Sequence, residues 1–200
     1  MSGFLRFNLG EFCARSGHDP AELYRVTAAL PKGGWCAGGA LRRTLAGMPL
    51  DSDFDFFFRS ADELATWEKG LPPSLKLVRE TDHHKHWRGA IEGSELPVDI
   101  QAIRFRFYDS AEAVIDSFDY TITQFALDGG SLVTTSYALW DLGRRKLAIH
   151  KVTYPVATLR RMLKYTRQGF TACAGCMATL MRETASNPDA LAALDIEYVD

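Results

Sequence analysis

The sequence predicts an α+β fold in which one β-sheet is flanked by helices. Residues 51–58 alternate as a strand does, residues 35–46 pass from an apolar strand through two glycines into a short helix, and residues 155–170 are amphipathic. A chain of 200 residues with 46% hydrophobic residues can bury one substantial core. We therefore expect one main domain with a small helical addition.

The first 34 residues are predicted to be a helical lead-in. Asn8 can cap a helix through Ala14, and Asp19-Pro20 has the order of a cap followed by a first-turn proline. These residues offer only isolated candidates for chemistry, so packing or partner recognition is the preferred interpretation. We expect three parts: the lead-in at 1–34, a core at 35–153, and a basic helical neck with an acidic tail at 154–200.

The core is predicted to alternate helices and strands. We expect a helix over 61–69, a hairpin of 76–80 with 87–91, a strand over 97–105, a helix over 109–115, a strand over 118–127, a hairpin beyond 128–130, and later helices over 155–170 and 171–184. The predicted turn at 81–86 contains His83, His84 and His86. These histidines could bind a metal or phosphate, but a solvated loop is the preferred interpretation.

Residues 35–59 hold the strongest functional signal. Gly38 and Gly39 lack a Cβ, so a triphosphate can approach that turn closely and accept hydrogen bonds from its backbone N–H groups. Strand alternation places Asp51, Asp53 and Asp55 on one face. Hard carboxylate oxygens on one rigid strand are suited to Mg²⁺, and Mn²⁺ is also acceptable.

These residues resemble a known superfamily. The segment Gly38-Gly39-Ala40-Leu41-Arg42, followed after a spacer by Asp53-Phe54-Asp55, is similar to the signature of DNA polymerase β-like nucleotidyltransferases. The further stretches 118–122 and 160–165 narrow the resemblance to the head and neck of class II CCA-adding enzymes and bacterial poly(A) polymerases. The resemblance covers about residues 35–170 and implies a nucleotidyltransferase-type mixed sheet followed by a helical neck.

The resemblance also implies site residues. Asp53 and Asp55 would hold metal ions, while Gly38, Gly39, Arg42 and Asp119 would contact the nucleotide. Asp99 lies in an apolar strand matching the family's third acid, so it would be the third catalytic and metal-binding carboxylate and would activate the acceptor hydroxyl. Its alternatives are a turn cap or an ion pair with Arg104. The base-reading motif of the family and its body and tail domains are missing. The arginine that usually precedes the Asp119 motif in the family is also absent, and Ser117-Phe118 stands there instead.

The charge distribution favours a polyanionic partner. Residues 142–182 contain nine Lys or Arg and no Asp or Glu. In the predicted neck helix, Arg160, Lys164 and Arg167 share the side opposite an apolar stripe of Leu159, Met162, Leu163 and Phe170, so we expect them to bind RNA.

Other features limit the class of protein. No apolar run reaches the ~20 residues of a membrane span and the start is not a signal peptide, so we expect a cytoplasmic protein without a membrane partner. The four cysteines are too few for a disulfide scaffold. Cys173 and Cys176 could form half of a zinc site, but two small core residues on a helix are the preferred interpretation.

The predicted function is metal-dependent transfer of a nucleoside monophosphate from a nucleoside triphosphate, with release of pyrophosphate. An RNA 3′ end, tRNA-like in kind, is the preferred acceptor because of the basic segment. The alternatives are a protein-modifying nucleotidyltransferase of the toxin–antitoxin kind and a non-catalytic nucleotide- or RNA-binding module.

Overall fold

The fold is centred on one mixed sheet of eight strands. The computed structural model describes residues 3–94 and 96–186. The strand order is β1-β8-β7-β2-β3-β6-β5-β4, and every neighbouring pair is antiparallel except β3 and β6. The strands are β1 (Phe4–Asn8), β2 (Trp35–Ala37), β3 (Phe54–Phe57), β4 (Lys76–Glu80), β5 (His84–Gly89), β6 (Val98–Ile103), β7 (Phe125–Asp128) and β8 (Ser131–Thr135).

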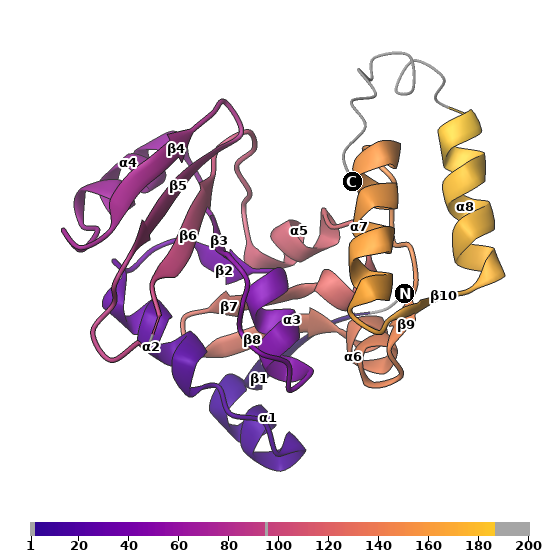
Figure 1. The fold of residues 1–200 in the computed structure, drawn as a ribbon, viewed down its shortest axis with the longest axis horizontal. Coiled ribbons are helices and arrows are strands. Elements are labelled where there is room, and N and C mark those ends of the chain that lie inside the picture. Colours follow the sequence, from indigo (N-terminus) through magenta and orange to yellow (C-terminus); the bar gives the residue numbers. More distant parts are fainter. Residues whose placement is uncertain (1–2, 95, 187–200) are drawn as a thin grey trace.

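Helices flank this sheet, which confirms the predicted α+β class (Figure 1). They are α1 (Leu9–Ser16), α2 (Ala21–Ala29), α3 (Gly39–Leu45), α4 (Ala61–Lys69), α5 (Ala111–Asp116), α6 (Ser136–Gly143), α7 (Pro155–Arg167) and α8 (Ala174–Ala185), with a 3₁₀ turn η1 (Thr121–Thr123). A short parallel pair, β9 (Lys146–Leu147) and β10 (Thr171–Ala172), ties α6 to the neck helices α7 and α8. No described helix combines the length and the apolar character needed to cross a bilayer.

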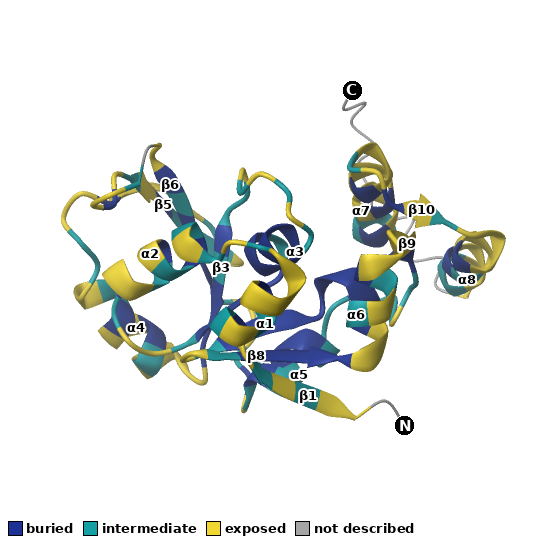
Figure 2. Cartoon of the chain, turned by 90° about the horizontal axis from the view of Figure 1, so that it is seen from below, coloured by how far each residue is buried: buried dark blue, intermediate teal, exposed yellow. Residues whose placement is uncertain are grey.

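The alternation in β3 divides the core into two layers. Phe54 and Phe56 belong to the larger buried cluster, which also contains residues of α1 to α4. Phe57 points to the other face and joins a smaller cluster with Val114 and Ile115 of α5. Figure 2 shows the buried strands enclosed between helices. The two faces of the predicted strand are therefore confirmed, but β3 begins at Phe54, so Asp51 and Asp53 precede it.

The lead-in also contributes a strand that was not predicted from the sequence. Strand β1 pairs with β8 from Phe4↔Thr135 to Asn8↔Ser131 and closes one edge of the sheet. The Asn8 side chain then accepts a hydrogen bond from Glu11 N–H, which starts α1 as predicted. Since Leu9 and Leu23 are fully buried in the larger cluster, the lead-in packs in the same core as residues 35–153.

The strand expected over 118–127 is wrong in its first half. The chain forms η1 before β7 begins at Phe125. Thr121 Oγ1 donates a hydrogen bond to Asp141 Oδ2 at 2.7 Å, and Thr123 Oγ1 donates one to Tyr120 O at 2.8 Å. Local bonds of this kind compete with a sheet ladder.

Helix α7 is present as predicted, but its buried face differs. Thr158, Met162 and Tyr165 are buried, whereas Leu159 and Leu163 of the predicted stripe are 45% and 53% exposed. The buried positions are spaced by four and three residues, as expected for one face of a helix. The first two of them come one residue before the two leucines of the predicted stripe. The predicted acidic tail, 187–200, lies outside the described residues.

Removal of the α5 cap should produce a moderate loss of stability. Ser110 Oγ accepts a hydrogen bond from Ala113 N–H at 3.2 Å. We expect Ser110→Ala to lower the free energy of unfolding by about 1 kcal/mol in urea titration, because that N–H loses its partner. Ser110→Asp should retain the stability. Equal losses in both variants would contradict a role for the cap.

Candidate active site

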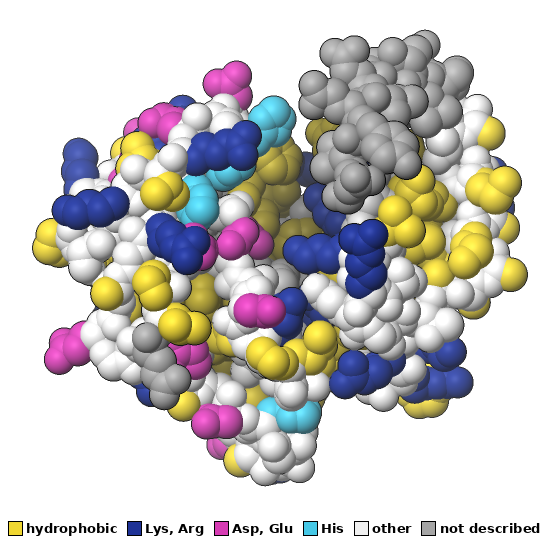
Figure 3. Space-filling model, in the orientation of Figure 1, with side chains coloured by type: hydrophobic (Ala, Val, Ile, Leu, Met, Phe, Trp, Pro, Cys, Tyr) yellow, Lys and Arg dark blue, Asp and Glu magenta, His cyan; other side chains and the backbone are white. Residues whose placement is uncertain are grey.

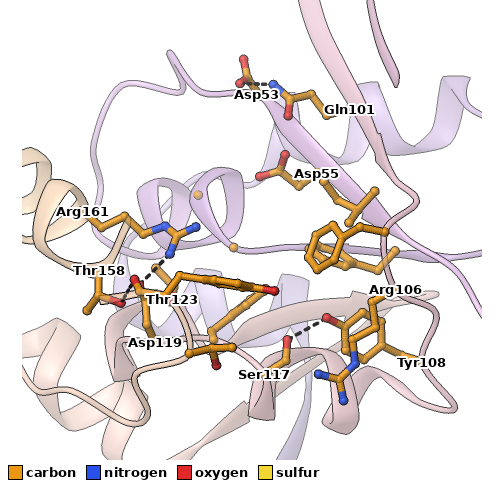
Figure 4. A pocket seen from close by; sticks show the side chains of 18 of the residues that line it. Asp53, Asp55, Gln101, Arg106, Tyr108, Ser117, Asp119, Thr123, Thr158 and Arg161 are labelled. Atoms are coloured by element: carbon orange, nitrogen blue, oxygen red, sulfur yellow. Dashed lines mark hydrogen bonds and ion pairs between the residues drawn. The ribbon is translucent and has the colours of Figure 1, made fainter. Parts of the chain in front are cut away.

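The two carboxylates of β3 point toward one cavity. In the parallel pair of β3 with β6, Asp55 lies opposite Gln101, and in the antiparallel pair with β2 it lies opposite Ala37. Asp53 precedes the strand, and its Oδ2 accepts a hydrogen bond from Gln101 Nε2 at 2.5 Å (Figure 4). Both acids line the same cavity, as predicted, although only Asp55 belongs to the strand itself.

The cavity has a volume of about 540 Å³ and lies between the sheet and α7. Figure 4 shows Asp55 and Arg161 extending into it from β3 and α7. In Figure 3, acidic side chains near the centre of the molecule face basic side chains across a hollow. The residues that line the cavity and concern the chemistry are Gly38, Gly39, Asp53, Asp55, Gln101, Asp119, Thr158, Arg161 and Tyr165.

The electrostatics of Asp55 are those of a site that lacks compensating positive charge. The pKa of Asp55 is raised to about 7, mainly by burial and also by the neighbouring charge of Asp53, against the smaller opposing influence of Lys164 and Arg161. A carboxyl group in this state gains from any cation that enters the cavity. A cation bound next to Asp55 would therefore stabilise the ionised form of this carboxylate.

The glycine turn forms another part of the wall. Gly38 has φ 85° and ψ −122°, a conformation that side chains with a Cβ rarely adopt. Its N–H donates to Phe125 O at 2.9 Å, which anchors the turn to β7. A Cβ at Gly39 would lie 2.6 Å from Ser52 Oγ. The backbone conformation therefore favours glycine at position 38, a Cβ at position 39 would require the Ser52 side chain to move, and both glycines line the cavity.

Asp119 and Arg161 form an ion pair inside the cavity. Asp119 is only 9% exposed, and its Oδ2 accepts a hydrogen bond from Arg161 Nη1 at 2.7 Å. Burial opposes the charge on Arg161, but the Asp119 carboxylate more than offsets it and raises the pKa of Arg161. Arg161 was not among the site residues predicted from the sequence. The spacing of Thr158, Arg161 and Tyr165 by three and four residues was the signal that could have found it, since all three line the cavity.

Arg42 does not lie where a phosphate contact was expected from the sequence. It is 1% exposed and does not belong to the cavity lining; its Cζ lies 4.9 Å from the ring centre of Tyr165 and 5.4 Å from that of Phe170. Its Nε and Nη1 have no hydrogen-bond partner in the described part of the chain, and burial lowers its pKa. The side chain stacks α3 against the neck instead of reaching the cavity.

Asp99 is not grouped with the other two acids. Its Oδ1 lies 2.7 Å from His86 Nε2, and its Oδ2 lies 3.6 Å from Arg88 Nη1. The parallel register puts Gln101, two residues further on, beside Asp55. Among the described residues there is no group of three His, Cys, Asp or Glu side chains suited to a metal. The expected three-carboxylate centre is therefore reduced to the Asp53–Asp55 pair.

Asp99 instead lines a second cavity of about 770 Å³. Its other lining residues include Arg25, Asp51 and Arg88. Asp53 belongs to the lining of both cavities. The two hollows thus meet at one carboxylate.

The histidines do not all lie in a loop, as was expected from the sequence. Strand β5 begins at His84, so His84 and His86 are strand residues, and only His83 remains in the turn. His84 pairs with Ile103 and His86 with Gln101 across β5 and β6. Burial lowers the pKa of His84. The hairpin turn is shorter than predicted because Thr81 closes it, with Thr81 N–H donating to His84 O at 2.9 Å.

Comparison with known proteins identifies the family. The family model described as "Gabija anti-defense 2 family protein" matches residues 4–145. The chain belongs to this family. A relative called "Gabija anti-defense 2", from Bacillus phage SPbetaL7, is 24% identical over 169 residues, which are 83% of this chain and 40% of that protein.

Solved structures of CCA-adding enzymes share the fold of this family member. The complex with ATP aligns with a TM-score of 0.62 at 18% identity, over 94% of this chain and 48% of the enzyme. The apo form gives 0.58 at 18% identity with the same coverage, and the Bacillus stearothermophilus enzyme with CTP gives 0.52 at 16% identity, over 88% and 42%. The predicted nucleotidyltransferase-type fold is confirmed. The chain spans less than half the length of these proteins.

The predicted RNA-binding residues of this family member lie on the outside of α7. Arg160, Lys164 and Arg167 are all exposed. Lys164 is also close enough to the cavity for its charge to oppose the rise in the pKa of Asp55. These positions are compatible with a polyanionic partner that approaches along α7.

The Cys-x-x-Cys pair begins α8. Cys173 caps this helix, with Cys176 N–H donating to its Sγ at 3.4 Å. Cys176 is 5% exposed, and burial raises the pKa of its thiol. One cysteine thus caps the helix and the other packs in the core.

Proposed function

We propose that this protein is a metal-dependent nucleotidyltransferase that moves a nucleoside monophosphate from a nucleoside triphosphate to an acceptor hydroxyl. The observation that supports this most strongly is the arrangement of Asp53 and Asp55 in one cavity with the Gly38–Gly39 turn and Arg161. Two acids on one strand, a backbone corner without Cβ atoms and a basic group are the parts needed to receive a polyphosphate with its cations.

The donor atoms fit Mg²⁺ or Mn²⁺. Asp53 and Asp55 offer hard carboxylate oxygens, and the raised pKa of Asp55 indicates that a cation would relieve uncompensated negative charge there. These two residues would hold the metal. When bound, such an ion neutralises polyphosphate charge and makes a nearby hydroxyl more acidic.

The other residues then bind and orient the substrates. The Gly38–Gly39 turn would receive the phosphates, and Arg161, positioned by Asp119, would supply positive charge to them. Asp99 would act on the acceptor side, because it lines the second cavity together with Asp53. There it can take the proton of the attacking hydroxyl as the phosphorus–oxygen bond forms and pyrophosphate leaves.

We propose RNA as the preferred acceptor, because Arg160, Lys164 and Arg167 are exposed beside the cavity. Replacing all three with alanine should weaken RNA affinity and lower the magnitude of its salt dependence by about 0.7 for each phosphate that is no longer neutralised. Incubation with each labelled nucleoside triphosphate, Mg²⁺ and total cellular RNA or protein would show which acceptor becomes labelled. Label on protein would support the protein-modifying alternative over RNA.

A second candidate function is a nucleotide-binding module without turnover. It is favoured by Gln101, an amide beside Asp55 where a third carboxylate was expected. Nucleotide binding without transfer to either RNA or protein would support this candidate and refute the enzyme.

The name of the phage relative suggests the biological setting. We propose that this chain also counteracts the defense named Gabija, with nucleotidyl transfer as its chemistry. Expression in cells that carry this defense should restore phage infection, and Asp55→Asn should remove the effect. Full restoration of infection by Asp55→Asn would separate the biological role from catalysis.

Arg161 and Arg160 provide a matched pair for testing the division of roles on α7. We expect Arg161→Gln to raise the KM for the nucleotide about tenfold, since one charged hydrogen bond to phosphate is worth roughly 1.5 kcal/mol. Arg160→Gln, next to it but outside the cavity lining, should leave this KM unchanged. Initial rates across nucleotide concentrations test both, and equal effects would contradict the assignment.

A further inference from the structure

Helix α6 carries exposed aromatic side chains on one face. Tyr137 is 61% exposed and Trp140 is 62% exposed, whereas Ala138 and Leu142 are buried. Residues three apart lie on the same side of a helix, so the two rings share a surface. Neither residue lines the cavities described above. Large rings that face solvent are common where a protein binds a partner.

Positively charged side chains lie next to these aromatic residues. Arg144, at the end of α6, holds its Cζ 5.1 Å from the ring centre of Trp140. Arg145 and Lys146 follow and are exposed. Within 3–94 and 96–186, no ion pair includes any of these three side chains. Figure 3 shows Lys and Arg side chains together over the part of the molecule where Figure 1 places α6.

The backbone at Arg145 adds an independent observation. Arg145 has φ 52° and is the one residue other than glycine with positive φ in the described part of the chain. This left-handed position follows a helix end, where glycine is the usual residue because a Cβ is unfavourable there. Arg145 O accepts a hydrogen bond from Thr171 N–H at 2.8 Å, which holds the backbone in this conformation. The exposed segment that carries Arg144, Arg145 and Lys146 is therefore held in a defined conformation after α6.

We propose that this surface, formed by Tyr137, Trp140, Arg144, Arg145 and Lys146, binds single-stranded nucleic acid. The two rings can stack on successive bases, while the three cations contact the backbone phosphates. A duplex hides its base faces, so it would use only the cations. Protein interfaces also favour Tyr, Trp and Arg but are depleted of Lys, so the run of three consecutive cations at 144–146 favours a polyanion. The surface is distinct from the catalytic cavity, so binding does not depend on turnover.

The surface is nonetheless linked to the cavity wall. Asp141 of α6 accepts a hydrogen bond from Thr121 of η1, and Thr123 of the same turn lines the cavity. A nucleic-acid strand bound on α6 would therefore lie next to the part of the cavity wall that contains Thr123.

Tryptophan emission offers a direct test with the full chain. Trp140 is 62% exposed, while Trp35, Trp67 and Trp87 are at most 8% exposed, so a ligand on this surface should quench mainly Trp140. We expect a 20-residue oligouridine to quench the emission, and a duplex of the same length to bind at least tenfold more weakly. Fluorescence anisotropy of labelled oligouridine should show about tenfold weaker binding for Trp140→Ala and a smaller loss for Tyr137→Ala.

Charge variants complete the test. Arg145→Gln should weaken binding and reduce the slope of log affinity against log salt by about 0.7. Leu77→Ala and Arg79→Gln, on exposed β4 at the opposite edge of the sheet, are the matched controls and should change nothing. Circular dichroism confirms that each variant is folded. Unchanged affinity in folded Trp140→Ala, equal binding of duplex, or equal competition by polyglutamate would overturn the proposal.

Discussion

Asp55→Asn should abolish nucleotidyl transfer and, at the same time, stabilise the metal-free protein at neutral pH. In the proposed function Asp55 holds a metal ion, so its loss would remove several kcal/mol of charge stabilisation, and ~4 kcal/mol corresponds to about a 10³-fold lower rate. We therefore expect the rate of labelled nucleotide transfer to fall by at least about 10³-fold. The opposite effect on stability follows because the variant no longer has to bury a negative charge beside Asp53.

The pH dependence of stability tests the same group. Folding raises the pKa of Asp55 from 3.8 to about 7, so the folded state binds the proton more tightly than the unfolded state. The contribution of this group is fully present below its unfolded pKa and is lost as pH rises through the folded one. With a chelator present, the free energy of unfolding should decline between these two values by at most about 1.4 kcal/mol per pH unit.

Two controls make this result specific. Asp82→Asn, an exposed acid in the β4–β5 turn, should change neither transfer nor the pH profile. Mg²⁺ should flatten the decline in the unmodified protein, because a cation favours the ionised carboxylate. If chemical denaturation gave the same pH profile for Asp55→Asn and the unmodified chain, the buried charge at Asp55 would be disproved.

Gly38→Ala should reduce nucleotide affinity by about 10- to 100-fold, since holding a residue with a Cβ in such a conformation costs about 1–3 kcal/mol. The turn has φ 85° and ψ −122°, and a Cβ there would lie 3.9 Å from Asp55 Oδ2, which is ordinary contact. The effect therefore comes from the backbone, which moves to relieve the strain. Isothermal titration with a non-hydrolysable triphosphate measures it.

Gly129→Ala is the matched control. Gly129 also has positive φ, 60°, and a Cβ there would have no neighbour within 4 Å. It belongs to the turn between β7 and β8 and does not line either cavity. Its substitution should cost some stability but leave nucleotide affinity unchanged. Equal losses of affinity in both variants would assign the effect to general destabilisation.

Local patterns in the sequence predicted the parts of the site that depend on neighbouring residues. The alternation around Asp53 and Asp55 was enough to place both acids on one face, because a strand repeats every two residues. The predicted cap at Asn8 likewise marked a real helix start. Each of these predictions needs only a few consecutive side chains.

The parts that depend on register and packing could not be predicted in the same way. Whether Asp99 or Gln101 lies beside Asp55 depends on the alignment of two strands that are far apart in sequence, and the hairpin length decides whether His86 reaches Asp99. Arg42 was misplaced because the rings that bury it come from the neck, more than a hundred residues later. A single sequence contains no direct signal for these distances.

The shared position of Asp53 has a kinetic consequence. Because the two hollows meet at this side chain without overlapping elsewhere in their linings, a donor in one leaves room for an acceptor in the other. Transfer at this site would then pass through a ternary complex, with both substrates held at once and no covalent nucleotidyl-protein stage. Double-reciprocal plots at several acceptor concentrations should intersect, whereas parallel lines would indicate a substituted enzyme.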